Sequence, residues 1–293
     1  MWDQLVLNFG FRALWSPGFI LFTLILAGLY FWAIGPGRNR FADSAPVPLY
    51  KQVLFVIGLF FFYLGYGGPL YLIGHLMFSA HMFQMAISLM IAPPFLLLGM
   101  PSWLLKALVP KLPFQPILKP FTKPLVAIIL FNAMFSFYHF PIVFDYLLVH
   151  KPMHNLFQAL IFIAALNMWW ALVVPVPEWN RLSELKRIGL IFLDGILLTP
   201  ACALIIFANK ALYTTFSDPN TWAVALSLCL PGQMTVPPEL IEQFMWFELL
   251  EDQRLGGVVM KLIQEFMYMS FIGYTFFQWI KKEPLSQIDP IHE

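Results

Sequence analysis

The chain has 293 residues, of which 11% are charged, 60% hydrophobic and 17% aromatic, and its formal net charge is +1 at pH 7. Because a soluble domain carries about 25% charged residues, this composition excludes an ordinary soluble globule and favours a protein embedded in lipid. The small net charge also leaves no basic field that would attract nucleic acid.

Uncharged stretches of about 20 apolar residues, the length of a helix that crosses a bilayer, recur along the chain. No cleavable signal peptide is recognisable, so we expect the first stretch to remain in the protein. Several of the limits carry Gly or Pro. The predicted spans are 18–34, 53–73, 76–98, 124–140, 155–174, 188–208 and 256–280. We therefore predict an all-α, polytopic membrane protein, a seven-transmembrane-helix bundle that forms a single domain over residues 1–293.

The distribution of Lys and Arg predicts the orientation of the bundle. Alternate connections hold twelve basic residues on one side and four on the other. Because basic loops are retained in the cytoplasm, we expect the N-terminus outside and the C-terminus in the cytoplasm.

The longest connection, 209–255, lies on the predicted outer side and carries six acidic and two basic residues. It is too long for a simple turn. From Pro237 to Leu250 it combines apolar and acidic residues, which predicts a short amphipathic helix lying over the mouth of the bundle.

Five of the six histidines fall at the predicted outer ends of spans three to five or in the loop between the last two: His75, His81, His139, His150 and His154. Neutral imidazole is the commonest metal ligand in proteins, so this one-sided distribution suggests a metal site. If one helix begins near residue 74, its rise places His81 about 9 Å below His75. Pro152 suits a first helical turn, which would point His154 inward near the depth of His75.

Met77, His81, Met85 and Ser88 recur at helical spacing and would share one face. Thioether and imidazole ligands select Cu(I) over magnesium or calcium, and they suit zinc less well. The alternative is structural: methionines fill gaps between helices, and interfacial histidines bond lipid headgroups or backbone. We favour the metal interpretation for His75, His81 and His154 together, with His139 on the same side. His150 and Met153 are secondary candidates.

Other polar residues lie within predicted spans. Asp194, Lys261 and Glu265 are costly in hydrocarbon and are expected to face the bundle interior, where Lys261 and Glu265 can pair at i, i+4. A proton relay or a counter-charge for a bound cation is the alternative. Cys202 and Cys229 could form a disulfide, bind copper as thiolates or remain inert thiols, and we favour the last two. No catalytic motif occurs, so we do not expect an enzyme.

Several stretches, in order along nearly the whole chain, resemble the CtaG family of assembly factors for the cytochrome c oxidase whose subunit II carries a fused cytochrome c. They are Phe9–Pro17, Phe78–Met82, Ala92–Pro94, Phe121–Pro124, Tyr138–His139, Met168–Trp170, Asp194–Cys202 and Leu250–Gln253. Distant members often carry a histidine at the positions of Met85 and Gln158. The first replacement keeps a copper ligand and the second removes one.

The resemblance implies a bacterial plasma-membrane protein that supplies copper from the outer side to the oxidase subunits. The ligand types favour Cu(I), and an extracytoplasmic copper donor is a candidate partner. The motif histidines carried over are His81 and His139. The aromatic-rich spans and the outer loop are compatible with a homodimer. Two alternatives stay open: a haem held by His81 and His154, and a proton-coupled transporter using Asp194, Lys261 and Glu265.

Overall fold

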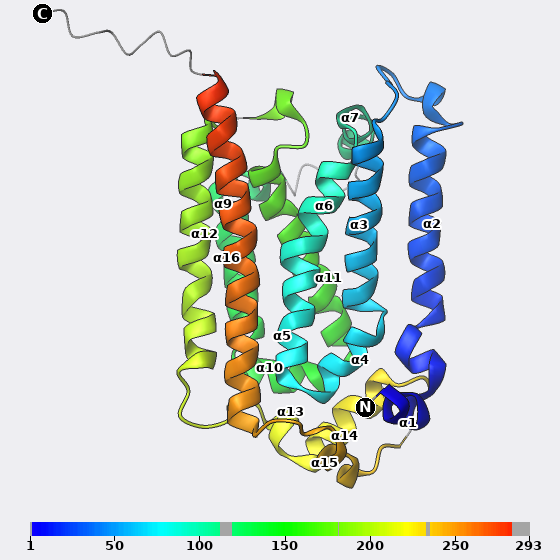
Figure 1. Ribbon diagram of the computed structural model, residues 1–293, viewed down its shortest axis with the longest axis vertical. Helices are drawn as coiled ribbons and strands as arrows, with labels where there is room; N and C mark the ends of the chain where they lie inside the picture. The colour runs from blue at the N-terminus through cyan, green and yellow to red at the C-terminus, as the bar shows by residue number, and fades with distance from the viewer. Residues whose placement is uncertain (1, 112–118, 181, 233–234, 283–293) are drawn as a thin grey trace, which may run out of the picture.

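The computed structural model describes residues 2–111, 119–180, 182–232 and 235–282, and every regular element among them is helical. Among these residues, six helices are long and apolar enough to cross a membrane, or seven if one bent pair counts as a single span. The predicted all-α polytopic fold is therefore confirmed. The helices that run side by side along the long axis are α2 (Pro17–Ile34), α3 (Leu49–Tyr66), α5 (Phe78–Ala86) with α6 (Ala92–Gly99), α9 (Pro124–Tyr138), α11 (Lys151–Val173), α12 (Glu184–Ile206) and α16 (Leu249–Lys282) (Figure 1).

The outward faces of these helices expose large apolar side chains, among them Leu24 on α2, Ile196 on α12 and Phe266 on α16. Exposed apolar surface on this scale is unfavourable in water and favourable in hydrocarbon. The exterior of the bundle thus agrees with the membrane class that the composition predicts. The short helix α7 (Ser102–Leu108) and the 3₁₀ turns Arg38–Arg40, Val109–Lys111, Lys119–Thr122 and Pro177–Trp179 lie in the connections.

One end of the bundle is covered by short helices, and we call it the capped end. The covering helices are α1 (Trp2–Trp15), α4 (Pro69–Leu76), α10 (Pro141–Leu148), α13 (Thr214–Ser217), α14 (Pro219–Cys229) and α15 (Ile241–Phe244) (Figure 1). The predicted spans do not include α1. It bends at Gly10, whose φ of 70° is easy only for glycine. Its Phe9 ring packs on Phe244 of α15, with centroids 5.6 Å apart.

The chain breaks between α4 and α5 at Met77, which has extended backbone angles of φ −138° and ψ 140°. The prediction that His75 and His81 lie on one helix is therefore wrong: His75 lies in the last turn of α4 and His81 in the first turns of α5. The second predicted span falls within the span candidate Leu49–Leu76, in which α3 stops at Tyr66 and Pro69 starts α4. A Pro at the first helical position explains this new start.

Between α5 and α6 the helix widens into a π-helical turn, Ile87–Ile91. Ser88, inside this turn, faces Gly65 of α3 so closely that a Cβ on Gly65 would lie 2.0 Å from the Ser88 hydroxyl. The Gln84 amide also donates to the Gly65 carbonyl at 2.8 Å. Glycine at position 65 thus allows α3 to pack against the π-helical turn.

The outer connection differs in part from the prediction. The expected amphipathic helix from Pro237 to Leu250 is divided into a 3₁₀ turn, Pro238–Leu240, the four-residue α15 and the start of α16 at Leu249. Two further helices, α13 and α14, precede it. At the neighbouring corner, α9 and α10 meet at an angle of 75°, and His139 lies in the bend.

Candidate functional site

Four of the predicted histidines meet at the capped end, and each comes from a different part of the fold. His75 lies on α4, His81 on α5, His139 at the end of α9 and His154 on α11. All four side chains are at least 96% buried. We call these four residues, together with Tyr138, the histidine cluster.

The cluster consists of two histidine pairs on either side of a phenol. The His75 and His154 ring centroids are 5.7 Å apart, and those of His81 and His139 are 6.1 Å apart. The Tyr138 ring stacks on His81 at 5.8 Å and on His154 at 6.2 Å. The rings therefore converge inside the protein and do not point into lipid.

Backbone hydrogen bonds fix the protonation of two of these rings. His75 Nδ1 lies 2.8 Å from the Tyr71 carbonyl, and His139 Nδ1 lies 2.8 Å from the Phe135 carbonyl. Because a carbonyl oxygen only accepts, each Nδ1 carries the hydrogen, and the neutral ring keeps its lone pair on Nε2. An orienting bond of this type is usual for histidines that bind metals.

The Nε2 atoms of His81 and His139 are buried and have no hydrogen-bond partner. Leaving a buried polar atom unpaired costs about 1–3 kcal/mol, so such atoms need an explanation. Two such unpartnered nitrogen atoms on neighbouring imidazole rings are consistent with a site that binds a ligand.

The second pair is already hydrogen-bonded. The Tyr138 hydroxyl lies 3.1 Å from His154 Nε2, and the Gln158 amide lies 3.1 Å from that hydroxyl and 3.3 Å from His154 Nε2. Gln158 also contacts the Met85 sulfur at 3.6 Å. The thioether of Met85 therefore lies at the edge of the histidine cluster.

Asp252 on α16 positions the start of α5, and the sequence alone does not identify it as a site residue. Its carboxylate accepts hydrogen bonds from the Phe78 N–H at 2.7 Å, from the Ser79 N–H, and from the Ser79 hydroxyl. This cap holds the helix turn that carries His81. The Leu250–Gln253 stretch was the only sequence signal.

The connection between α12 and α13 closes the cluster from the capped end. The Tyr213 hydroxyl donates to the His139 carbonyl at 2.9 Å, and its ring stacks on Phe78 at 4.4 Å. Burial raises the pKa of Tyr213, so it stays protonated and keeps donating. Asp145 on α10 accepts from the Thr215 N–H and hydroxyl at 2.9 and 2.7 Å, which fixes α13.

Of the other candidates, Met77 is buried at the α4–α5 break, whereas His150 and Met153 lie outside the cluster. His150 is exposed and stacks on Tyr146 at 4.1 Å. Met153 is half exposed. The structure thus does not bring these last two together with the four buried histidines.

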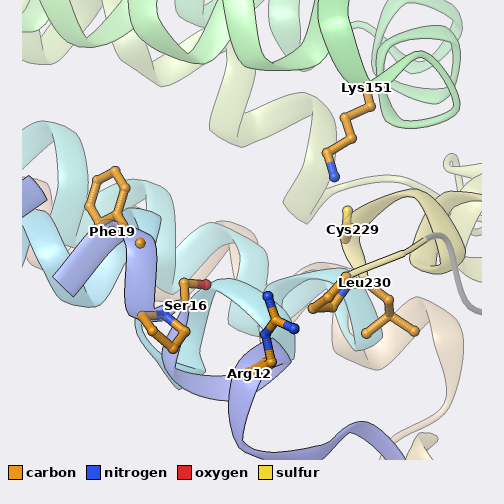
Figure 2. A pocket seen from close by; sticks show the side chains of 9 residues that line it. Arg12, Ser16, Phe19, Lys151, Cys229 and Leu230 are labelled. Carbon is orange, nitrogen blue, oxygen red and sulfur yellow. The ribbon is translucent and has the colours of Figure 1, made fainter. Parts of the chain in front are cut away.

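The two cysteines are both free and occupy different places. Cys202 is buried on α12. Cys229, at the end of α14, lies near the His75 ring and the Tyr71 hydroxyl of α4. It also lines an open groove of about 270 Å³ on the capped end (Figure 2).

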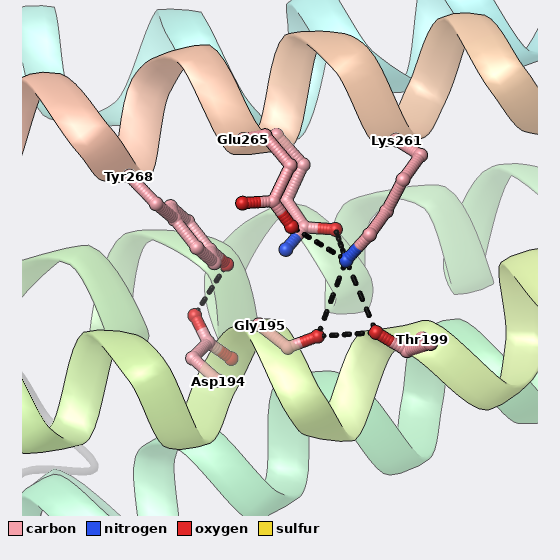
Figure 3. Close-up of polar contacts among 7 residues, drawn as sticks. Asp194, Gly195, Thr199, Lys261, Glu265 and Tyr268 are labelled. Carbon is pink, nitrogen blue, oxygen red and sulfur yellow. Dashed lines mark hydrogen bonds and ion pairs between the residues drawn. The ribbon is translucent and has the colours of Figure 1, made fainter.

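Asp194 and Glu265 belong to a separate polar network between α12 and α16 (Figure 3). The Tyr268 hydroxyl donates to one Asp194 oxygen at 2.5 Å and the Asn132 amide donates to the other. Lys261 pairs with Glu265 at 2.7 Å, the predicted i, i+4 contact, and also donates to the Thr199 hydroxyl at 3.0 Å. The Glu265 side chain is 50% exposed, so the prediction that it faces the bundle interior is wrong.

Among the residues that the structure describes, no three His, Cys, Asp or Glu side chains converge in an arrangement ready to hold a metal ion. The histidine cluster therefore provides two free imidazole nitrogens and a nearby thioether without a closed ligand set. Small rotations of side chains would be needed to direct these groups at one point.

The fold and the cluster define an all-α polytopic membrane protein with a buried, partly unsatisfied histidine site at one end of the bundle. The chain belongs to the cytochrome c oxidase caa3 assembly factor family (Caa3_CtaG), whose family model matches residues 28–282. The quoted Phe9–Pro17 stretch lies outside that match. No curated protein and no solved structure matches the chain. Membership supports a role in cytochrome c oxidase assembly, in association with the oxidase, and suggests a non-catalytic role.

Proposed function

We propose that the protein is a Cu(I)-binding assembly factor, a chaperone or insertase that holds copper at the histidine cluster before the ion passes to a cytochrome c oxidase subunit. Copper is here the cargo of the protein. The proposed ligands are His81 and His139, with His75, His154, Met85 and Met77 completing the set as side chains adjust.

The observation that carries this proposal is the pair of buried, unpartnered Nε2 atoms on His81 and His139. Their rings are 6.1 Å apart, and a backbone carbonyl directs the His139 tautomer so that Nε2 is the free atom. Imidazole and thioether groups together favour copper over hard cations such as magnesium. A bound ion would use lone pairs that otherwise remain buried without a partner.

The proposed location is a bacterial plasma membrane with the capped end outside. This orientation rests on the excess of basic residues in the connections at the opposite end of the bundle. An extracytoplasmic copper donor would then meet the capped end directly.

Replacement of His81 tests the proposal. Purified full-length protein in neutral detergent is titrated with Cu(I) against a chromogenic chelator of known affinity. We expect about one high-affinity ion per chain in the wild type and at least tenfold weaker binding in His81→Ala, equivalent to about 1.4 kcal/mol. His150→Ala, which removes an exposed histidine outside the cluster, is the matched control and should bind as the wild type does.

Unchanged Cu(I) affinity in a folded His81→Ala variant would contradict the copper proposal. The haem alternative is checked in the same preparation by its absorption spectrum, since a haem protein shows a Soret band. The Tyr138 ring, stacked on both His81 and His154, fills the space that a haem between those two ligands would require.

A further inference from the structure

The open groove on the capped end is formed by segments that are far apart in the sequence. Arg12 comes from the end of α1, Ser16 precedes α2, Lys151 begins α11 and Cys229 ends α14. In Figure 2 the Arg12 and Lys151 side chains extend from opposite sides towards the Cys229 thiol. The groove thus has two cationic walls with a thiol between them.

No residue that lines the groove is acidic. Within the described part of the chain, the ion pairs are Lys106 with Glu178 and Lys261 with Glu265, so neither Arg12 nor Lys151 has a carboxylate partner. Two unneutralised positive charges around one cavity favour an anion and repel a free metal cation. The Ser16 hydroxyl adds a donor at the same edge (Figure 2).

The position of the groove indicates where its ligand comes from. It opens at the start of α2, which is the first predicted membrane span, and beside α1. That helix buries Leu5 and Phe9 against the protein while Leu7 and Phe11 on its other side are 83% and 63% exposed. A short helix that packs on the protein along one face and exposes large apolar side chains along another suits the membrane interface, where lipid headgroups lie.

We propose that this groove binds a phosphoryl group, held by Arg12 and Lys151, and that the group is the headgroup of an anionic phospholipid. Arginine recognises phosphate through paired N–H donors, and lysine adds a point charge. The groove adjoins the histidine cluster at Cys229, but its proposed phosphoryl contacts, Arg12 and Lys151, are not cluster residues and do not depend on copper binding. A bound headgroup would cover the Cys229 thiol.

The covering of Cys229 provides the measurement. Full-length protein carrying Cys202→Ser, so that Cys229 is the single thiol, is purified in neutral detergent and alkylated with a maleimide. Short-chain phosphatidylglycerol, short-chain phosphatidylcholine or inorganic phosphate is added in parallel samples at equal concentration. We expect phosphatidylglycerol to slow alkylation at least fivefold and phosphatidylcholine to have little effect.

The protection ratio is then measured in Arg12→Gln/Lys151→Gln, where it should fall to about one, and in the charge-conserving Arg12→Lys/Lys151→Arg, where it should persist. Arg38→Gln/Lys123→Gln, which removes two charges at the opposite end, is the matched control. Taking the ratio within each variant cancels any change in the intrinsic reactivity of the thiol.

Equal protection by inorganic phosphate would support the phosphoryl site and assign free phosphate as its ligand. Equal protection by both lipids, protection that survives in Arg12→Gln/Lys151→Gln, or no protection at all would overturn the proposal. Because the experiment contains no copper, none of these results bears on the proposed metal function.

Discussion

The bundle buries two groups of polar side chains, and they differ in whether their titratable groups are paired. Both oxygens of Asp194 accept hydrogen bonds, from Asn132 and from Tyr268, and the nearby Lys261 has an ion-pair partner. In the histidine cluster, Nε2 of His81 and of His139 have none. Around Asp194 the unpartnered buried atoms are the neutral amide atoms Asn132 Oδ1 and Gln264 Nε2, while the carboxylate itself is fully paired. A paired carboxylate stabilises a helix interface, whereas unpartnered imidazole nitrogens at a buried site are available to a ligand. The comparison assigns the Asp194 network to structure and the cluster to function.

The largest effect is expected from a substitution that tests the structural role of the Asp194 network. Asp194→Ala leaves the buried Tyr268 hydroxyl without its acceptor and removes a partner of Asn132. We expect the free energy of unfolding to fall by about 2–4 kcal/mol, because together the two unpaired buried polar groups destabilise the folded state by that amount. Thermal unfolding in detergent measures the loss, and Cu(I) stoichiometry should be unchanged.

Glu265→Gln is the control for that experiment. Its ion pair with Lys261 is half exposed, so its removal should cost less than about 1 kcal/mol. Loss of copper from a folded Asp194→Ala protein would instead place Asp194 on the metal pathway.

A smaller effect is expected at Asp252, which holds the start of the helix that carries His81. Asp252→Ala removes the cap on α5, which should cost about 1–2 kcal/mol. Because the first turns of α5 carry His81, Cu(I) affinity should also fall a few-fold. Glu251→Gln, at the exposed neighbouring position, should change neither stability nor Cu(I) affinity. An unaltered Cu(I) affinity in Asp252→Ala would show that the cap does not position His81 for copper binding.

Gln158→His tests the functional role assigned to the histidine cluster. Gln158 already contacts His154 and the Met85 sulfur, so an imidazole at this position adds a potential ligand. We expect about tenfold tighter Cu(I) binding, equivalent to about 1.4 kcal/mol. Gln158→Leu, which adds no ligand, should not tighten binding. Equal affinities in both variants would show that residue 158 lies outside the coordination sphere.

The smallest expected effect concerns pH. Hydrogen bonds from the Thr221 hydroxyl and N–H lower the pKa of the Asp218 carboxyl, the cap of α14. A lowered folded-state pKa stabilises the protein above the ordinary value of about 4, and this contribution is lost as the pH falls through the folded-state pKa. Asp218→Asn should therefore differ from wild type in unfolding temperature at pH 6 and converge with it towards pH 3. A constant difference across this range would contradict the linkage.

The sequence predicts the membrane class well because long apolar stretches are stable in few environments other than a lipid bilayer. It also identifies the four histidines of the cluster, since their one-sided placement follows from the order of the spans. It places the boundary between the second and third spans at residues 74–75 and not at Met77, because residues 75–78 contain no Gly or Pro to mark the break. Nor does it predict that Asp252 and Tyr213 hold the cluster, since those contacts join residues far apart in the chain.

The π-helical turn at Ile87–Ile91 sets the angular relation between the two halves of the helix that contains it. A helix advances 100° per residue, and one extra residue in a turn rotates everything before it by that amount relative to everything after it. His81 and Met85 precede the turn, and the residues of α6 follow it. Deleting one residue from this turn would rotate either His81 and Met85 or the residues of α6 out of their contacts. Every side chain of the site would still be present.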